Sequence, residues 1–267
     1  MISVDAILRF SVKSYCSFCR KAYLRVSYCS IFKNRGVVKF YDHFKIENLL
    51  TNSKKAKMII SVTSLKGGVG KSTISQNLAV CFAHMGYKVA IVDTDTNASS
   101  VHWSGIREEK HPHITVMGIG TSDALRKNIK QLEKDYDIVV IDGTPSLSKL
   151  VSTIIILGDV VLIPIRPSGL DIWATEKFIE KYDQAKALKE EVKAFFILNE
   201  YNSRVSLNQS IKEALEELEI DTLKSTLRHR IAYEEAVVMG MGVYEYKDAK
   251  AKKEVTALAN EVLKIIS

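Results

Sequence analysis

The chain has 267 residues, 46% of them apolar and 26% charged, which is the composition of an ordinary globular protein with one principal domain. No stretch reaches the roughly 18 uninterrupted apolar residues of a membrane span, because the nearest candidate, residues 151–165, contains Asp159. The net charge of +7 arises in residues 1–57, which hold 12 Lys and Arg against 3 Asp and Glu. Residues 58–267 hold 26 against 28, so their overall charge gives no general signal for nucleic-acid binding.

Residues 1–57 also carry three of the four cysteines and nine of the 22 aromatic residues. We expect Met58 to be the natural start, and residues 1–57 to be an upstream extension with no settled fold. One alternative is a zinc site formed by Cys16, Cys19, Cys29 and His43, although their spacing matches no zinc-finger pattern. The basic, acid-poor composition is also typical of a transit peptide. The segment lacks the charged start, apolar core and small-residue cleavage site of a signal peptide, and it lacks the spacing of a helix-turn-helix.

From residue 58 onward, short apolar runs alternate with helical patterns. Strands are predicted near residues 58–63, 88–92, 114–117, 137–141, 159–164, 193–198 and 221–224. This alternation predicts an α/β domain over residues 58–267, with a mainly parallel twisted sheet flanked by helices.

The first predicted strand leads into the glycine-rich run Lys66-Gly67-Gly68-Val69-Gly70-Lys71-Ser72-Thr73, and a helix is predicted from Ser72 to Met85. A strand that passes through glycines into a helix start aims several backbone N–H groups and the positive helix terminus at one point, which suits a polyphosphate. In such a loop Lys71 would reach the β and γ phosphates, and the Ser72 hydroxyl would ligate Mg²⁺.

Acidic residues end two further predicted strands. Asp93 and Asp95 close the strand at residues 88–92, and Asp142 closes the strand at residues 137–141. Ligands of an open parallel sheet collect at the carboxyl ends of its strands. These carboxylates are therefore well placed for a metal ion and an attacking water beside the glycine-rich run.

The run fits Lys-Gly-Gly-x-Gly-Lys-Ser/Thr and resembles the deviant Walker A motif of the P-loop ATPase family that includes ParA partition proteins, MinD and the nitrogenase iron protein. The resemblance implies an ATPase that uses ATP and Mg²⁺, with nucleotide contacts along the whole run. It implies that Lys66 crosses a dimer interface to the nucleotide of the other subunit, that Asp95 positions the hydrolytic water, and that Asp142 supports Mg²⁺ through bound water. The family often has Pro-Gln after the aspartate that matches Asp95, whereas this chain has Thr96-Asn97, so the motif does not assign the chain to one subgroup of the family.

The C-terminal third resembles small ParA proteins at two places. Asn199 ends a predicted strand where the family often offers an asparagine to the adenine base, and a simple turn residue is the alternative. The segment with Arg228 and Arg230 resembles the arginine-bearing segment of small ParA proteins, which implies a DNA-contact edge; a solvated surface is the alternative. The last predicted helix has an apolar stripe that favours core packing over a membrane-seeking tail.

The resemblance is therefore to a ParA-like ATPase that forms a homodimer with ATP and binds non-specific DNA. It implies that the protein moves DNA cargo with a ParB-type partner, and that it lies in the cytoplasm in association with the nucleoid. A MinD-like positioning ATPase at a membrane and a regulatory ATP switch without DNA cargo are the alternatives. An electron-transfer protein like the nitrogenase iron protein needs cluster-ligating cysteines after the switch regions, and no cysteine follows Cys81.

Overall fold

The computed structural model describes residues 57–146, 148–167, 171–202, 211 and 213–266. The expectations for residues 1–56, including the zinc and transit-peptide alternatives, lie outside the described residues. Within the described part of the chain, no helix combines the length and the apolar character needed to cross a membrane.

Six parallel strands form one sheet in the order β3-β2-β4-β1-β5-β6. Their bounds are β1 Met58–Val62, β2 Val89–Asp93, β3 Thr115–Gly118, β4 Ile138–Asp142, β5 Val160–Ile165 and β6 Lys193–Leu198. Every residue of β1, β2, β4 and β5 is buried, as expected for strands that are covered on both faces of a parallel sheet. The predicted α/β fold is confirmed.

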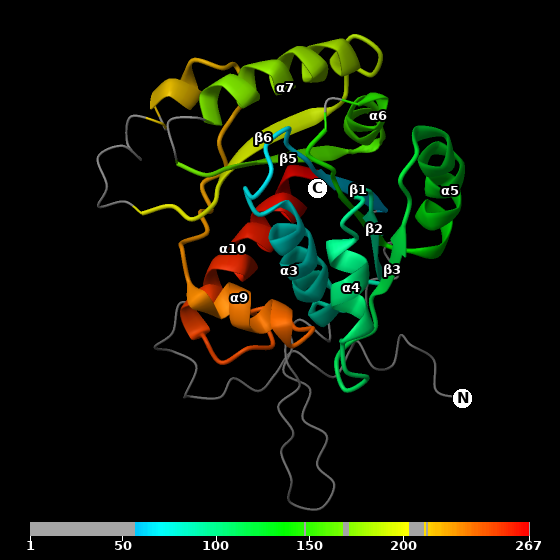
Figure 1. The fold of residues 1–267 in the computed structure, drawn as a ribbon, viewed down its shortest axis with the longest axis vertical. Helices are drawn as coiled ribbons and strands as arrows, with labels where there is room; N and C mark the ends of the chain where they lie inside the picture. The colour runs from blue at the N-terminus through cyan, green and yellow to red at the C-terminus, as the bar shows by residue number, and fades with distance from the viewer. Residues whose placement is uncertain (1–56, 147, 168–170, 203–210, 212, 267) are drawn as a thin grey trace, which may run out of the picture. The chain divides into compact units, whose positions relative to one another are not determined.

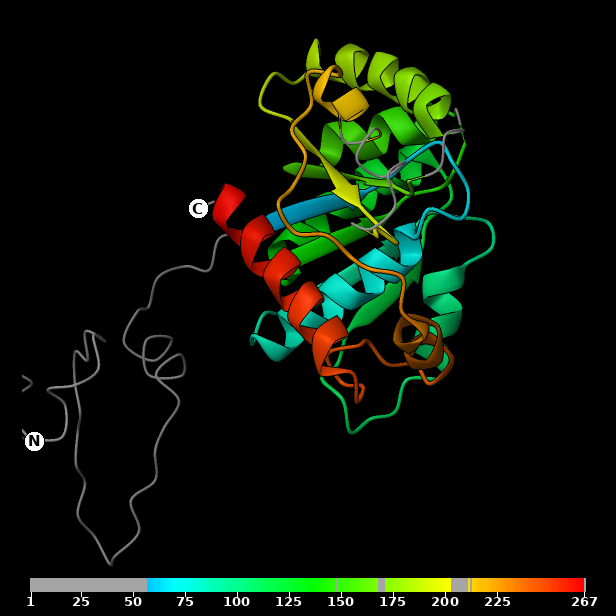
Figure 2. The ribbon, with the colours of Figure 1, turned by 90° about the vertical axis from the view of Figure 1, so that its left-hand side faces the viewer.

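Helices cover both faces of the sheet (Figures 1 and 2). On one face lie α3 Lys71–His84, α4 Ser99–Gly105, α9 Ile231–Val238 and α10 Ala249–Ile266, whose apolar residues share a core with alternate residues of β1, β2, β4 and β5. On the other face lie α5 Ser122–Asp135, α6 Lys149–Leu157 and α7 Asp171–Lys186. The sheet is thus the middle of three layers, and its strand ends are held in place from both sides.

The strand register brings the predicted site residues to one edge. Asp142 is the register partner of Val62 on one side and of Asp93 on the other, so the loops that follow β1, β2 and β4 start side by side. The phosphate loop, defined here as residues Lys66 to Thr73, leaves β1 at this edge and enters α3.

Two C-terminal predictions have different outcomes. The seventh strand, expected near residues 221–224, is only an isolated bridge between Phe196 and Thr222. The Leu223 N–H still donates to the Phe196 carbonyl, but the following N–H groups, of Lys224 and Ser225, donate to the Glu261 carboxylate of α10 and not to β6. The core-facing stripe of the last helix is confirmed, since its apolar residues lie in the core, namely Val255, Leu258, Ala259 and Val262.

Candidate functional site

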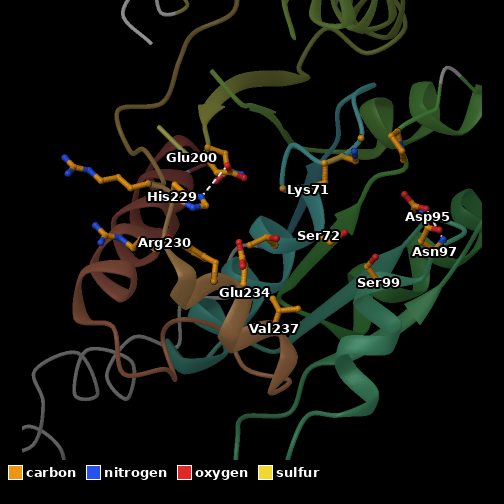
Figure 3. A pocket seen from close by; sticks show the side chains of 18 residues that line it. Lys71, Ser72, Asp95, Asn97, Ser99, Glu200, His229, Arg230, Glu234 and Val237 are labelled. Carbon is orange, nitrogen blue, oxygen red and sulfur yellow. Dashed lines mark hydrogen bonds and ion pairs between the residues drawn. The ribbon is translucent and has the colours of Figure 1, made fainter. Parts of the chain in front are cut away.

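A cavity of about 590 Å³ opens beside the phosphate loop. Its walls come from that loop, from the segment after β2, from the end of β6 and from residues 228–237. Figure 3 shows Asp95 and Asn97 on one side, Glu200 and His229 on the other, and Lys71 and Ser72 between them. The sequence-predicted residues that line this cavity are Gly67, Gly68, Gly70, Lys71, Ser72, Thr73, Asp95, Asn199, Arg228 and Arg230.

The phosphate loop is closed by glycines in the left-handed region of backbone space. Gly68 has φ of 73° and Gly70 has φ of 95°, values that other residues adopt only with strain. Lys71 follows at the start of α3 with only 7% of its surface exposed, and its Nζ donates to the Lys66 carbonyl at 2.8 Å. Burial lowers the pKa of the Lys71 ammonium, against the opposing effect of Asp142 and Asp95. A cation so shielded from water interacts strongly with a bound phosphate.

Lys66 is placed differently from Lys71. It does not line the larger cavity; it lines a neighbouring cavity of about 340 Å³ together with Gly67, Gly68, Arg166 and Pro167. The two lysines of the motif therefore line different cavities, which adjoin at Gly67 and Gly68. This placement is compatible with the implied contact of Lys66 to a second subunit, which remains a prediction.

Asp142 lies at the end of β4, fully buried beneath the phosphate loop. Ser100 Oγ donates to its Oδ2 at 2.7 Å, and Ser75 Oγ donates to its Oδ1 at 3.3 Å. Burial raises the pKa of the Asp142 carboxyl to about 7, while hydrogen bonds from serines, including Ser72, act in the opposite direction. The two residues predicted for the metal, Ser72 and Asp142, are thus in contact.

The surroundings of Asp142 fit a water-bound magnesium ion. Mg²⁺ keeps several waters and takes few protein ligands, so a serine hydroxyl and one carboxylate are an adequate set beside phosphate oxygens. The Thr63 hydroxyl next to Gly143 and the Gln76 side-chain oxygen are buried without a hydrogen-bond partner among the described residues. Such orphaned groups are ones that an ordered water would satisfy. The described residues hold no cluster of three or more histidines, cysteines or acids suited to a different metal.

The two aspartates after β2 have separate roles. Asp93 is buried, and its carboxylate accepts from three backbone N–H groups, those of Asp95, Ser100 and Val101, which fixes the turn into α4. Asp95 is only half-buried, lines the large cavity, and uses one oxygen to accept from the Asn97 N–H at 2.9 Å. Of these two aspartates, Asp95 is therefore the one that presents its carboxylate to a ligand in the cavity.

The opposite wall carries charged side chains that are mostly paired. Glu200 lies 2.6 Å from Arg166 and 3.5 Å from His229, and the His229 contact is drawn in Figure 3. Arg230 forms a bidentate pair with Glu254 of α10, with a shortest distance of 2.5 Å. Arg228 is exposed. The two arginines predicted to contact DNA therefore differ: Arg228 is exposed, whereas Arg230 is paired with Glu254. Their contact with DNA stays a prediction.

The sequence analysis did not identify Arg166, Glu200, Ser75 and Ser100. Arg166 follows β5 directly and Glu200 lies two residues beyond the end of β6, so a search for charged residues at strand ends finds both. Ser75 lies one helical turn after Ser72, which is also visible in the sequence. Ser100 has no such signal, because its contact depends on how α4 turns back over Asp142.

Two polar groups near the site, the Asn77 amide and the Trp103 indole, join elements of the fold. Asn77 donates to the Thr73 carbonyl and accepts from the Val243 N–H, so it joins α3 to the segment before α10. Trp103 is buried, and its indole N–H donates to the Met241 carbonyl.

Comparison with known proteins identifies the family. A model of the CobQ/CobB/MinD/ParA nucleotide binding domain matches residues 60–243. Maintenance of carboxysome distribution protein A of Halothiobacillus neapolitanus is 31% identical over 208 residues, covering 76% of this chain and 95% of that protein. Protein ParA of Rhizobium radiobacter is 28% identical over 192 residues, covering 71% and 86%. A putative plasmid partition protein of Borrelia burgdorferi bound to AMPPNP has a TM-score of 0.64 at 20% identity, covering 78% and 99%.

The chain belongs to the CobQ/CobB/MinD/ParA nucleotide-binding domain family. The family predicted from the phosphate loop is thereby confirmed, and the solved structure supports the same fold.

Proposed function

We propose that this chain is an ATPase that dimerises with ATP and uses this cycle to position a cargo. The observation that carries the proposal is the cavity itself: Lys71 and Ser72 lie at its base, Asp142 contacts Ser72 from below, and Asp95 lies on its rim. The relative named for maintenance of carboxysome distribution supports a positioning role.

Hydrolysis would join a water oxygen to the γ-phosphorus while the bond to the β–γ bridging oxygen breaks, releasing ADP. Asp95 would hold that water, because its carboxylate is open to the cavity. Lys71 would release the Lys66 carbonyl and turn to the phosphates. Bound Mg²⁺, held by Ser72 and through water by Asp142, would supply charge neutralisation during the transfer.

The dimer would bring Lys66 of each subunit to the nucleotide of the other. Lys66 lines the smaller neighbouring cavity and not the large one, so a second copy is the natural route to a nucleotide contact. Hydrolysis should then be slow in the monomer, because the charges are positioned completely only in the assembled dimer.

The ATP-bound dimer would bind non-specific DNA through residues 228–230 and associate with the nucleoid in the cytoplasm. Arg228 is the stronger candidate because it is exposed, whereas the Arg230 guanidinium is held by Glu254. A ParB-type partner would stimulate hydrolysis and link the ATPase to DNA cargo; a protein body is the other cargo class. The apolar stripe of α10 is buried in the core, which favours DNA over the MinD-like membrane alternative.

The test is retention of the purified full chain on non-specific double-stranded DNA with ATP·Mg and with ADP·Mg over a series of salt concentrations. We expect retention with ATP that weakens steeply with salt, and much weaker retention with ADP. The ADP sample is essential because residues 1–57 are basic and would bind DNA in both states. Equal retention in both nucleotide states, or none with ATP, would contradict the DNA proposal.

A further inference from the structure

The phosphate loop has carbonyl oxygens that are held from outside by side chains. Asn199 Nδ2 donates to the Val69 carbonyl at 2.8 Å, and Arg166 donates to the Gly68 carbonyl at 3.4 Å. These donors come from the ends of two neighbouring strands, Arg166 from directly after β5 and Asn199 from directly after β6. The loop between β1 and α3 is therefore braced by the adjacent part of the sheet.

Such a brace has a clear physical purpose. An anion-binding loop must turn its N–H groups inward, which turns some carbonyl oxygens outward, where they need hydrogen-bond partners. Val69 is 1% exposed and Asn199 is 8% exposed, so water has little access to the bond between them. A buried carbonyl that lost this donor would favour rotation of its peptide plane, and the adjoining N–H group would rotate with it.

Asn199 also packs directly against the turn. A Cβ atom on Gly70 would lie 2.2 Å from Asn199 Nδ2, far inside van der Waals contact. Glycine is therefore required at position 70 for two reasons: the backbone has a φ of 95°, and a side chain there would overlap the Asn199 amide.

Glu200, the next residue, orients the second donor. Its carboxylate lies 2.6 Å from the Arg166 guanidinium, which holds that side chain toward Gly68. Glu200 has φ of 53°, a left-handed conformation that is costly for a residue with a side chain. Strain of this kind persists where the surrounding contacts maintain it, and the brace supplies such a contact.

We propose that Asn199 and Arg166 are positioning residues that hold the phosphate loop in its phosphate-binding form before nucleotide arrives. The proposal rests on the proposed function only in taking the large cavity as a polyphosphate site. It differs from the adenine contact expected of Asn199, because the brace uses the amide nitrogen and acts on the phosphate end of a ligand. The amide oxygen of Asn199 is not needed for it.

The experiment compares two ligands, ATP and tripolyphosphate, which shares the phosphates but has no base. Isothermal titration with the full chain in Mg²⁺ would give both dissociation constants for the wild type and for Asn199→Ala. We expect Asn199→Ala to weaken both ligands by roughly tenfold, the effect of leaving one buried acceptor unpaired. Unchanged tripolyphosphate binding, with only ATP weakened, would overturn the brace and leave a base contact. Failure of the wild type to bind either ligand would contradict the proposed function instead.

Arg166 gives an independent variant whose substitution should disturb folding less, because its side chain is 47% exposed to solvent. Arg166→Ala should weaken tripolyphosphate by roughly threefold, since its bond to Gly68 is longer and wetter, and Arg166→Lys, which keeps a donor, should recover part of that loss. Asn128→Ala on α5, which removes an exposed amide bonded to Ala124, is the matched control and should change neither constant.

Hydrogen exchange separates loop positioning from a general loss of stability. In Asn199→Ala the amides of residues 67–70 should exchange faster, while the amides of β4 and α5 should keep their wild-type protection. Uniformly faster exchange, or unchanged exchange at the loop, would contradict a local brace.

Discussion

The two ends of the large cavity are built in different ways. The phosphate end comes from β1, the phosphate loop and α3, joined by Asp142 from the end of the neighbouring strand β4, and its key groups, Lys71 and Asp142, are buried. The opposite end comes from segments far apart in the chain, and its charged groups, Glu200, His229 and Arg228, are half-buried or exposed. The phosphate end is thus the more buried one, which is the environment that electrostatic stabilisation of a transferred phosphoryl group requires. The proposed DNA contact of Arg228 lies on the more accessible wall.

This comparison is tested most strongly by the two lysines of the phosphate loop. Lys66→Ala should leave ATP binding within about threefold of wild type but lower hydrolysis by about 10³-fold, the effect of removing one charge that acts on the transferring phosphoryl group. Lys71→Ala should lose ATP binding itself, because only Lys71 lines the large cavity. Nucleotide titration and phosphate release would be measured for both variants.

The control for the lysine pair is Lys130→Ala, an exposed position on α5 that should behave as wild type. Light scattering with ATP completes the test, since Lys66→Ala should remain a monomer where the wild type dimerises. Normal hydrolysis by Lys66→Ala would show that the lysine does not act across an interface.

The aspartates after β2 sharpen the contrast between a ligand-facing and a structural carboxylate. Asp95→Ala should lower hydrolysis by about 10²-fold or more through loss of the group that holds water, yet retain a dimer with ATP. Asp93→Ala should instead destabilise the fold by roughly 1–3 kcal/mol, since three N–H groups lose their acceptor. Single-turnover hydrolysis, light scattering and urea unfolding distinguish the two. A purely monomeric Asp95→Ala protein in ATP would contradict the assigned role.

The difference between contacts within one segment and contacts between distant segments explains which features of the fold and site the sequence predicts. The phosphate loop, the order of strands and helices, and the gathering of Asp95 and Asp142 at one edge follow from local patterns and from the rule for parallel sheets. The contacts of Ser100 with Asp142 and of Asn199 with Val69 do not, because each joins residues 42 or 130 positions apart through the packing of whole elements. The expected seventh strand failed for a similar reason, since the competing acceptor, Glu261, lies on a distant helix.

The smallest expected effect concerns the two arginines of the accessible wall. Arg228→Ala should weaken ATP-dependent DNA binding by roughly three- to tenfold and reduce the salt slope by about one, as for the loss of one phosphate contact. Arg230→Ala should change the salt slope less, because the charge it removes is already balanced by Glu254, and it should lower the melting temperature because the Glu254 carboxylate loses its arginine. Filter binding over a salt series and thermal unfolding give both quantities. If Arg230→Ala reduced the salt slope as much as Arg228→Ala, the ion pair with Glu254 would have to open on DNA, and the wall would be a moving surface in the ATP-bound dimer.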